Sequence, residues 1–284
     1  MNRMIALRTL LFLCLLAGSA VAEDVRVLTF NIRYENSSDG LDGWANRREA
    51  VAKVIEGADL AGLQEVKPGQ RAWLRERLPE FELVGIGREK DDTDESAPVV
   101  FRKERFALVE AGTFWLSESP EVVASKSWDS SLPRVCSWAT LKDRRDGQMV
   151  SFFNVHLDHR GPVSRDKAMA LVLERMGKAT NAVILTGDFN ATADSAPLRR
   201  VVGCEKPLLV SSLVALGQAD EGTFHGFTGK TGAAAIDFIF GEKERVKFSA
   251  RTILRTTYAG ADGAQRYVSD HFPVSAVVSV SGGR

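Results

Sequence analysis

The chain lacks a net charge. Lysine and arginine together number 37, aspartate and glutamate also number 37, and the formal charge at pH 7 is zero. Proteins that bind nucleic acid tightly and without sequence preference are usually basic, because neutralising phosphates supplies much of their affinity. The charge balance therefore disfavours a protein dedicated to degrading nucleic acid.

Cysteine is also scarce, with three in 284 residues. Cys14 falls in the N-terminal segment discussed below, which leaves Cys136 and Cys204 in the remaining chain. Two cysteines so far apart are compatible with one disulfide in an oxidising compartment or with two separate thiols. The sequence does not choose between these states.

Long apolar runs, internal repeats and low-complexity linkers are absent after the N-terminus. The first residues combine Arg3 and Arg8, a short apolar run, and the small-x-small sequence Ala20-Val21-Ala22. These are the parts of a secretory signal peptide, and the apolar run is too short to span a bilayer. We therefore predict a signal peptide over residues 1–22, one domain over residues 23–284, and export to the periplasm or the medium. We expect a monomer without stable membrane insertion.

What the chain has is an alternation of apolar strands and amphipathic helices. Segments 25–34, 58–66 and 182–189 are apolar on both alternating faces, which is typical of strands buried on both sides. Helical spacing follows in 46–57, 68–78 and 165–178, the last with Ser164 as its expected cap. A hairpin is predicted from residues 135–141 to 149–157, and strands close the chain at 235–240, 246–254 and 272–280. This pattern predicts an α/β fold, a four-layer sandwich of two packed mixed β-sheets flanked by helices.

Acids and amides stand at the ends of these strands. The residues concerned are Asn31, Glu65, Asp188 with Asn190, Asp237, and Asp270 with His271. A carboxylate at the end of a buried strand must reach water, a metal or a polar partner. Several together predict one shared site at the rim of the scaffold.

The residue types point to a magnesium-assisted reaction with water. Glu65 and Asp270 offer hard oxygen ligands, which suit Mg²⁺ or Mn²⁺ better than Zn²⁺. Asp188 is suited to orienting or deprotonating a water molecule, and His271 to proton transfer, with Asp237 fixing its tautomer. Asn31 and Asn190 add neutral hydrogen-bond donors. Such a set fits attack of water on a phosphoester.

One stretch offers a competing interpretation. Asn154–Gly161, NVHLDHRG, differs by one residue from the H-x-H-x-D-H zinc signature of metallo-β-lactamase-fold hydrolases, with Asn154 in the place of the first histidine. A site of that kind needs more histidines than the four in this chain. In a strand, Asn154, His156 and Asp158 share one face. We therefore predict that His156 contacts phosphate, that Asp158 orients it, and that Asn154 binds no metal.

Six motifs, in this order, resemble those of the endonuclease/exonuclease/phosphatase superfamily, which has the deoxyribonuclease I-like fold. They are LTFNIRY, GLQEV, NVHLDH, TGDFN, AIDFIF and VSDHFPV, and they run from about Val25 to Val280. GTFWLSESP and SWDSSLPRVCSWA further resemble a secreted bacterial branch. Relatives there often show Gly-Glu-x-x-Pro, where this chain has Asp94-Glu95-Ser96-Ala97-Pro98.

The resemblance implies a role for each matching residue. Glu65, with Asn31 and Asp270, would hold Mg²⁺; Asp188 would orient the attacking water; Asn190, His156 and His271 would contact the phosphate; and Asp237 would hold His271. Outside these motifs, Arg134 and Arg165 are candidate phosphate clamps, because a guanidinium matches phosphate geometry. Asp158 is included with them as a candidate substrate contact.

Three functions are weighed. The favoured one is a secreted Mg²⁺-dependent phosphoesterase that hydrolyses a phosphomonoester or phosphodiester. A secreted deoxyribonuclease-like endonuclease is the alternative, with nucleic acid possible as a substrate but not favoured. A non-catalytic binding or toxin-type module on the same fold is disfavoured, because every catalytic position is filled.

Overall fold

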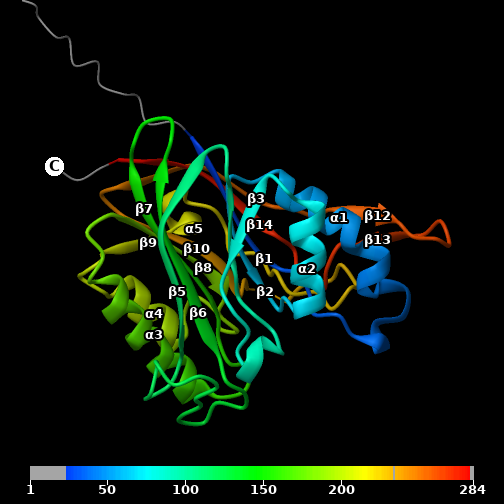
Figure 1. Ribbon diagram of the computed structural model, residues 1–284, viewed down its shortest axis with the longest axis horizontal. Coiled ribbons are helices and arrows are strands. Elements are labelled where there is room, and N and C mark those ends of the chain that lie inside the picture. Colours follow the sequence, from blue (N-terminus) through cyan, green and yellow to red (C-terminus); the bar gives the residue numbers. More distant parts are fainter. Residues whose placement is uncertain (1–23, 233, 282–284) are drawn as a thin grey trace, which may run out of the picture.

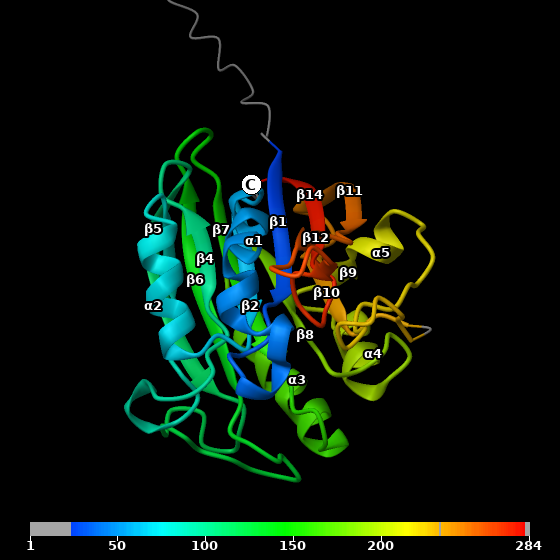
Figure 2. The same cartoon turned by 90° about the vertical axis from the view of Figure 1, so that its right-hand side faces the viewer.

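Two six-stranded β-sheets pack face to face, with helices on both outer faces (Figure 1). The structure is a computed structural model that describes residues 24–232 and 234–281. The predicted signal peptide, residues 1–22, lies outside the described residues. The four-layer arrangement of the predicted fold is confirmed, and Figure 2 views it from one of the helix-covered faces.

The first sheet has the strand order β11-β14-β1-β2-β4-β3. Its strands are β1 (Val25–Asn31), β2 (Leu60–Gln64), β3 (Phe81–Val84), β4 (Val99–Arg102), β11 (Val246–Ile253) and β14 (Val274–Val280). β1 and β2 are parallel, and α1 (Trp44–Glu56) makes the crossover between them. Together with α2 (Pro68–Arg77), α1 covers the outer face through a cluster that includes Phe30, Ile55 and Leu74.

The second sheet has the order β5-β6-β7-β8-β10-β9. Its strands are β5 (Phe106–Trp115), β6 (Val135–Asp143), β7 (Met149–His156), β8 (Ala182–Asp188), β9 (Leu209–Ser211) and β10 (Asp237–Glu242). α3 (Pro162–Met176) links the parallel strands β7 and β8, and packs on the outer face with α4 (Ala196–Val202). The short helix α5 (Ser212–Ala215) follows β9.

The core between the sheets is apolar over most of its area and polar near one end. Val27, Phe101, Phe152 and Ile184 belong to the apolar part. Apolar burial of this kind stabilises by about 25 cal/mol per Å². At the polar end, Gly62 of β2 lies so close to β7 and β8 that a Cβ there would stand 2.1 Å from Thr186 Oγ1 and 2.3 Å from Asn154 Oδ1. Only glycine permits this approach of the two sheets.

Some expected elements differ in detail. Helix α3 begins at Pro162, so Ser164 is not its cap, and Gly161 stands at the N-cap position. The carboxylate of Asp129 accepts from the backbone N–H groups of Val163 and Ser164 instead. That partner comes from a distant loop, which local sequence rules do not see. The sequence analysis also did not predict the separate hairpin of β12 (Thr257–Ala259) and β13 (Gln265–Tyr267).

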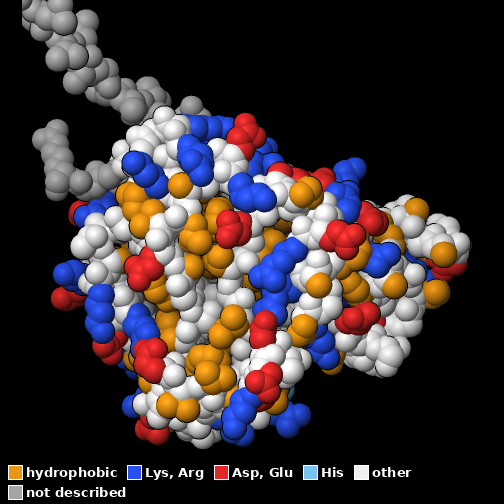
Figure 3. Space-filling model, viewed as in Figure 1, with side chains coloured by type: hydrophobic (Ala, Val, Ile, Leu, Met, Phe, Trp, Pro, Cys, Tyr) orange, Lys and Arg blue, Asp and Glu red, His pale blue; other side chains and the backbone are white. Residues whose placement is uncertain are grey.

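The outer surface is mixed in charge. Apolar side chains over β5 and β6 interrupt the charged ones on the face in Figure 3, and on the edge strand β5 Leu108 and Val109 are exposed. Cys136 is buried and Cys204 partly buried, and both are free thiols. Two 3₁₀ helices, Ser37–Asp42 and Lys90–Asp92, lie in the loops. No helix among the described residues is long and apolar enough to cross a membrane.

Candidate active site

The predicted site residues converge at one rim because of strand direction and register. The parallel strands β1 and β2 both end there, at Asn31 and just before Glu65. In the second sheet, His156 pairs with Asp188, and Asp188 pairs with Asp237 at the start of the antiparallel strand β10. The rim therefore receives side chains from both sheets, as the sequence predicts.

Asn31 connects the two sheets. Its Nδ2 lies 3.0 Å from Glu65 Oε1 and 3.0 Å from Asp188 Oδ2, and donates to both. Its Oδ1 accepts from the backbone N–H of Arg33 at 3.0 Å, which sets the orientation of the amide. Glu65 is itself fixed by the N–H of Tyr34, 3.0 Å from Oε2. The amide N–H group thus faces the acids, and Oδ1 retains one lone pair for another partner.

His271 is held by two carboxylates. Its Nδ1 lies 2.9 Å from Asp237 Oδ2, and its Nε2 lies 3.7 Å from Asp188 Oδ2. All three residues are buried. Burial acts to lower the pKa of His271, but the charges of Asp237 and Asp188 raise that pKa well above its usual value. The two carboxylates therefore favour the protonated form of His271.

Asp188 and His156 are both buried, but the pKa of Asp188 is raised and the pKa of His156 is lowered. Burial and the nearby charge of Asp237 raise the pKa of Asp188 to about 7. Burial and the positive charges of Arg134 and Arg88 hold the pKa of His156 well below its usual value, so His156 is neutral. Its Nε2 lies 3.6 Å from Asp188 Oδ2. A carboxyl group that titrates near pH 7 beside a neutral and a charged imidazole is suited to proton transfer.

The acids on the first sheet side fit a divalent cation. Burial and the like charge of Glu65 raise the pKa of Asp270, although His271, Arg33 and Arg47 oppose the shift. Arg33 Nε stands 3.8 Å from Asp270 Oδ2, too far for a hydrogen bond. Two neighbouring carboxylates with oxygen ligands to offer are the donor set that Mg²⁺ prefers. The predicted group of Glu65, Asp270 and Asn31 is therefore brought together.

A second group of potential ligands lies beside it. Donor atoms of Asp188, Asp237 and His271 all fall within 4.8 Å of one another. The hydrogen bond between Asp237 and His271 already uses Nδ1 of the histidine. In this set Asp188 accepts one hydrogen bond at each oxygen, from Asn31 and Asn190, and it lies next to the first group through Asn31.

The rim opens into a cavity of about 620 Å³. Predicted residues that line it are Glu65, Arg134, His156, Asp188, Asn190, Asp270 and His271. Asp237 and Asn31 contact these residues from behind. The lining residues that the sequence analysis did not assign to the site are Arg33, Tyr34, Lys67, Arg88, Asp94, Glu95, Leu132, His159, Phe224 and Ile236.

Asn190 follows β8 with a left-handed backbone conformation. Its φ is 47°, its N–H donates to Asp188 Oδ1 at 2.9 Å, and its Nδ2 donates to the carbonyl of Leu157 at 3.0 Å. Asparagine tolerates this conformation better than most residues. The turn therefore fixes one oxygen of Asp188 and leaves the other to Asn31.

Two of the three proposed substrate contacts lie behind the cavity. The carboxylate of Asp158 accepts from Ser131 Oγ at 2.6 Å and from the N–H groups of Arg160 and Gly161. No hydrogen bond joins it to His156 among the described residues. Arg165 donates to the carbonyl of Asp158 at 2.8 Å. In the structure both residues shape the loop after β7, and of the three only Arg134 lines the cavity.

Asn154 joins the two sheets. Its Oδ1 accepts from Gln64 Nε2 at 2.7 Å and from Thr186 Oγ1 at 3.1 Å, and its Nδ2 donates to the carbonyls of Leu63 and Pro98. The side chain is fully buried and all of its hydrogen-bonding positions are used. This residue is a structural link, which agrees with the rejection of the zinc motif.

The loop before β10 places an aromatic ring at the cavity. Phe224 is half-exposed and lies edge-on to His271, with ring centroids 5.0 Å apart. The adjacent His225 is buried against Phe272, with centroids 4.0 Å apart. His225 therefore packs inside the loop, whereas its neighbour Phe224 lines the cavity.

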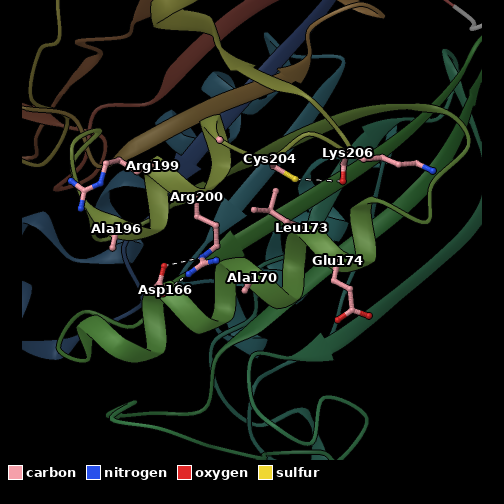
Figure 4. Close-up of a pocket in the computed structure, with 10 residues that line it drawn as sticks. Asp166, Ala170, Leu173, Glu174, Ala196, Arg199, Arg200, Cys204 and Lys206 are labelled. Atoms are coloured by element: carbon pink, nitrogen blue, oxygen red, sulfur yellow. Dashed lines mark hydrogen bonds and ion pairs between the residues drawn. The ribbon is translucent and has the colours of Figure 1, made fainter.

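A second cavity, of about 710 Å³, lies between α3 and α4 (Figure 4). There Arg200 is paired with Asp166, with Nη2 2.7 Å from Oδ2, and Cys204 Sγ faces the carbonyl of Lys206. The lining includes no histidine or amide, and of its two arginines Arg200 is paired with Asp166 while Arg199 donates to the backbone carbonyl of Asp194. The rim cavity is therefore the candidate active site.

The fold and this rim define a phosphoesterase-type hydrolase. The chain belongs to the endonuclease/exonuclease/phosphatase family, whose model matches residues 28–271. The membership predicted from the motifs is thereby confirmed. A search of curated proteins finds no match.

Solved structures support the same assignment. An endonuclease/exonuclease/phosphatase family protein from Bacteroides thetaiotaomicron is 32% identical, with a TM-score of 0.84 over 92% of this chain and 99% of that one. A mannosyl-6-phosphatase from the same organism is 33% identical, with a TM-score of 0.82 over 89% of this chain and 99% of that one. The human Nocturnin catalytic domain with bound sulfate, 19% identical at a TM-score of 0.69 over 92% of this chain and 97% of that one, shares the fold.

Proposed function

We propose that this protein is an exported, Mg²⁺-dependent phosphoesterase that hydrolyses a phosphate ester by attack of water. The observation that carries the proposal is the position of Asp188, which is buried between Asn31, His156 and His271. Glu65, Asp270 and Asn31 would hold Mg²⁺, and Mn²⁺ has the same ligand preference. When bound, the cation would stabilise negative charge on the phosphoryl oxygens.

Side chains of the protein activate the water and hold the phosphoryl group. Asp188 orients water and accepts its proton, for which a pKa of about 7 is well matched. Protonated His271 donates from Nε2 to a phosphoryl oxygen, and Asp237 holds the ring in place through Nδ1. Neutral His156 and the side-chain amide of Asn190 hold further phosphoryl oxygens.

A phosphomonoester is the substrate type that the comparisons favour. The 33% identical relative is a mannosyl-6-phosphatase, and it is covered almost completely by this chain. The endonuclease alternative is less supported, because Asp94 and Glu95 add acids to the cavity wall, where a polyanion would have to lie. Export rests on the predicted signal peptide over residues 1–22.

Hydrolysis of p-nitrophenyl phosphate and bis-p-nitrophenyl phosphate by purified residues 23–284 tests the activity. We expect release of p-nitrophenol with Mg²⁺ or Mn²⁺, loss after EDTA treatment, and recovery on adding the metal back. Activity that EDTA leaves untouched would contradict the metal-dependent mechanism. Plasmid nicking that exceeds the turnover of both esters would establish the endonuclease alternative instead.

Fractionation of cells that express the full chain with a C-terminal tag tests export. The mature protein, with an N-terminus at Glu23, is expected in the periplasm or the medium. Uncleaved protein confined to the cytoplasm would contradict the localisation.

A further inference from the structure

The candidate cavity has a second half that the hydrolytic groups do not occupy. Six residues form it: Arg88, Asp94, Glu95, Leu132, Arg134 and His159. We propose that this half binds the hydroxyl groups of a sugar, so that the substrate is a sugar phosphate whose sugar is the leaving group. The inference rests on the proposed phosphoesterase function and names the substrate class.

Arg88 is not free to clamp a phosphate. Its Nη1 and Nη2 donate to the two oxygens of Glu95 at 3.0 and 3.1 Å, and its Nε donates to Asp94 Oδ2 at 3.1 Å. The guanidinium is nearly buried, and Nε, Nη1 and Nη2 are each paired with one of these carboxylates. Each carboxylate oxygen keeps a lone pair, and Asp94 Oδ1 has no hydrogen-bond partner among the described residues. This corner therefore presents acceptors to a ligand.

Arg134 and His159 present donors beside them. Arg134 Nη2 lies 3.1 Å from His159 Nδ1, and a guanidinium can only donate, so Nδ1 is the acceptor. The proton of the neutral imidazole is then on Nε2, which can donate to a ligand. Arg134 is buried, its Nε has no hydrogen bond, and its closest carboxylate oxygen, Asp158 Oδ2, is 3.7 Å away. A buried guanidinium with unused donors is costly unless a ligand completes it.

The charge balance selects a neutral ligand. Two arginines face two carboxylates in this half, and Arg88 is already paired. A second phosphate would approach Asp94 and Glu95 at a Coulombic cost. Acceptors and donors side by side match instead the neighbouring hydroxyls of a sugar, each of which both donates and accepts. Leu132 is the one apolar residue of the six, which leaves little for a nucleobase to stack on.

The loop that carries Arg88 and Glu95 is held rigidly. Ser96 and Val66 exchange backbone hydrogen bonds at 2.8 and 3.1 Å, and Arg88 N–H donates to the carbonyl of Glu95 at 2.9 Å. The indole N–H of Trp115 donates to the carbonyl of Arg88 at 2.7 Å. Arg71 of α2 is paired with Asp92 in the same loop. Preorganisation of this kind is what a specificity site requires.

The reaction balances as an ordinary hydrolysis. Water oxygen bonds to phosphorus while the bond from phosphorus to the sugar oxygen breaks. The sugar oxygen takes up one proton and leaves as an alcohol, so the products are inorganic phosphate and the free sugar. Arg134 lies at the boundary of the two halves, because it faces His159 on one side and the charge of Asp188 on the other.

The test is a specificity ratio in single-carboxylate variants. We would measure kcat/KM for glucose 6-phosphate and mannose 6-phosphate, each divided by kcat/KM for p-nitrophenyl phosphate, which has no sugar hydroxyls. In Glu95→Gln and in the more exposed Asp94→Asn, the better of the two ratios should fall about 10- to 100-fold. Glu104→Gln, an exposed carboxylate in the turn before β5, is the matched control and should keep the wild-type ratio.

Several outcomes would overturn the inference. One is a specificity ratio that is unchanged in both variants, and another is an equal loss of kcat/KM on the sugar phosphates and on p-nitrophenyl phosphate. A third is a wild-type enzyme whose kcat/KM is higher for glucose 1,6-bisphosphate or for the aryl ester than for both sugar monophosphates. Thermal melts of each variant separate loss of the subsite from loss of the fold, and Asp94→Asn carries the test if Glu95→Gln does not fold.

Binding distinguishes this inference from the proposed function. If the wild type hydrolyses none of these esters with Mg²⁺, the phosphoesterase proposal fails, and calorimetric titration with glucose 6-phosphate, mannose 6-phosphate and inorganic phosphate decides the subsite. One sugar phosphate that binds at least about tenfold more tightly than phosphate, with the difference lost in Asp94→Asn, supports the subsite. Equal affinities would overturn it.

Discussion

Nδ1 of His271 and Oδ2 of Asp237 lie 2.9 Å apart, both buried, and the same carboxylate oxygen accepts from Thr223 Oγ1 at 2.6 Å. The aspartate thus holds one tautomer and one orientation of the imidazole, and it stabilises the protonated form. His271 can then present Nε2–H to the cavity. The pair behaves as a unit, in which Asp237 positions the group that touches the substrate.

Replacing Asp237 with asparagine tests this positioning role. The amide cannot stabilise the imidazolium, so kcat should fall about 10²- to 10³-fold while KM changes little. The pH profile of kcat should also lose the contribution of protonated His271, which a purely structural loss would not alter. Asp262→Asn, an exposed carboxylate in the β12–β13 hairpin, should behave as wild type. A loss under tenfold in Asp237→Asn would remove it from the mechanism.

Asp188→Asn should have a larger effect on catalysis. The amide cannot accept the proton of water, so kcat should fall about 10³-fold or more on p-nitrophenyl phosphate. Asn31 Nδ2 already donates to Asp188 Oδ2. If the introduced amide placed its NH₂ group at that position, two hydrogen-bond donors would face each other. Activity within tenfold of wild type would show that another group activates water. Circular dichroism and thermal melting check that the variant is folded.

Asn154→Ala should reduce stability without removing any cavity residue. The change removes the amide donors from the carbonyls of Leu63 and Pro98 and one acceptor from Gln64 Nε2, which keeps Thr29 Oγ1 and the carbonyl of Gly62. Loss of such a network costs about 2–4 kcal/mol, which corresponds to a fall in Tm of about 5–10 °C for a domain of this size. Asn46→Ala, at an exposed position of α1, is the control for losing an asparagine. Equal melting temperatures for wild type and Asn154→Ala would contradict a structural role.

Asp158 should make stability depend on acid pH. Burial acts to raise its pKa, but hydrogen bonds from Ser131, Gly161 and Arg160 and the charge of Arg134 outweigh burial, so the pKa lies below its usual range. The folded state therefore gains stability from Asp158 above about pH 4, the usual value in an unfolded chain, and loses it as pH falls towards the lower folded value.

Comparison of Tm for wild type and Asp158→Asn from pH 7 to pH 2.5 tests this dependence. The variant should melt below the wild type at pH 7, and the difference should shrink as the pH falls below about 4. A difference that is constant across this range would show that the Asp158 carboxylate charge contributes nothing to stability.

The alternation of strands and helices and the acids at strand ends could be predicted from the sequence. Both are local signals, since a strand buried on two faces is apolar throughout and a charge at its end must meet a partner. For the same reason the rim residues could be predicted from the sequence, and the family motifs gave each of them a role. These residues are Asn31, Glu65, Asp188, Asp237 and His271. The spacing alone did not place Arg88, Asp94 or Phe224 in the cavity.

Only the tertiary structure decided which polar residues face a ligand and which hold the scaffold. Asp158 accepts from Ser131, and Arg165 at the start of α3 donates to the carbonyl of Asp158, so both hold the loop after β7. Glu95 reaches the cavity because hydrogen bonds from Val66 and Trp115 fix its segment. Asn154 stands beside His156 in the motif that resembled a zinc site, but it faces Gly62 across the sheet interface. These assignments depend on contacts between residues far apart in the chain. The sequence by itself determined the main buried strands, the acids and amides at their ends, and the family, because each follows from neighbouring residues.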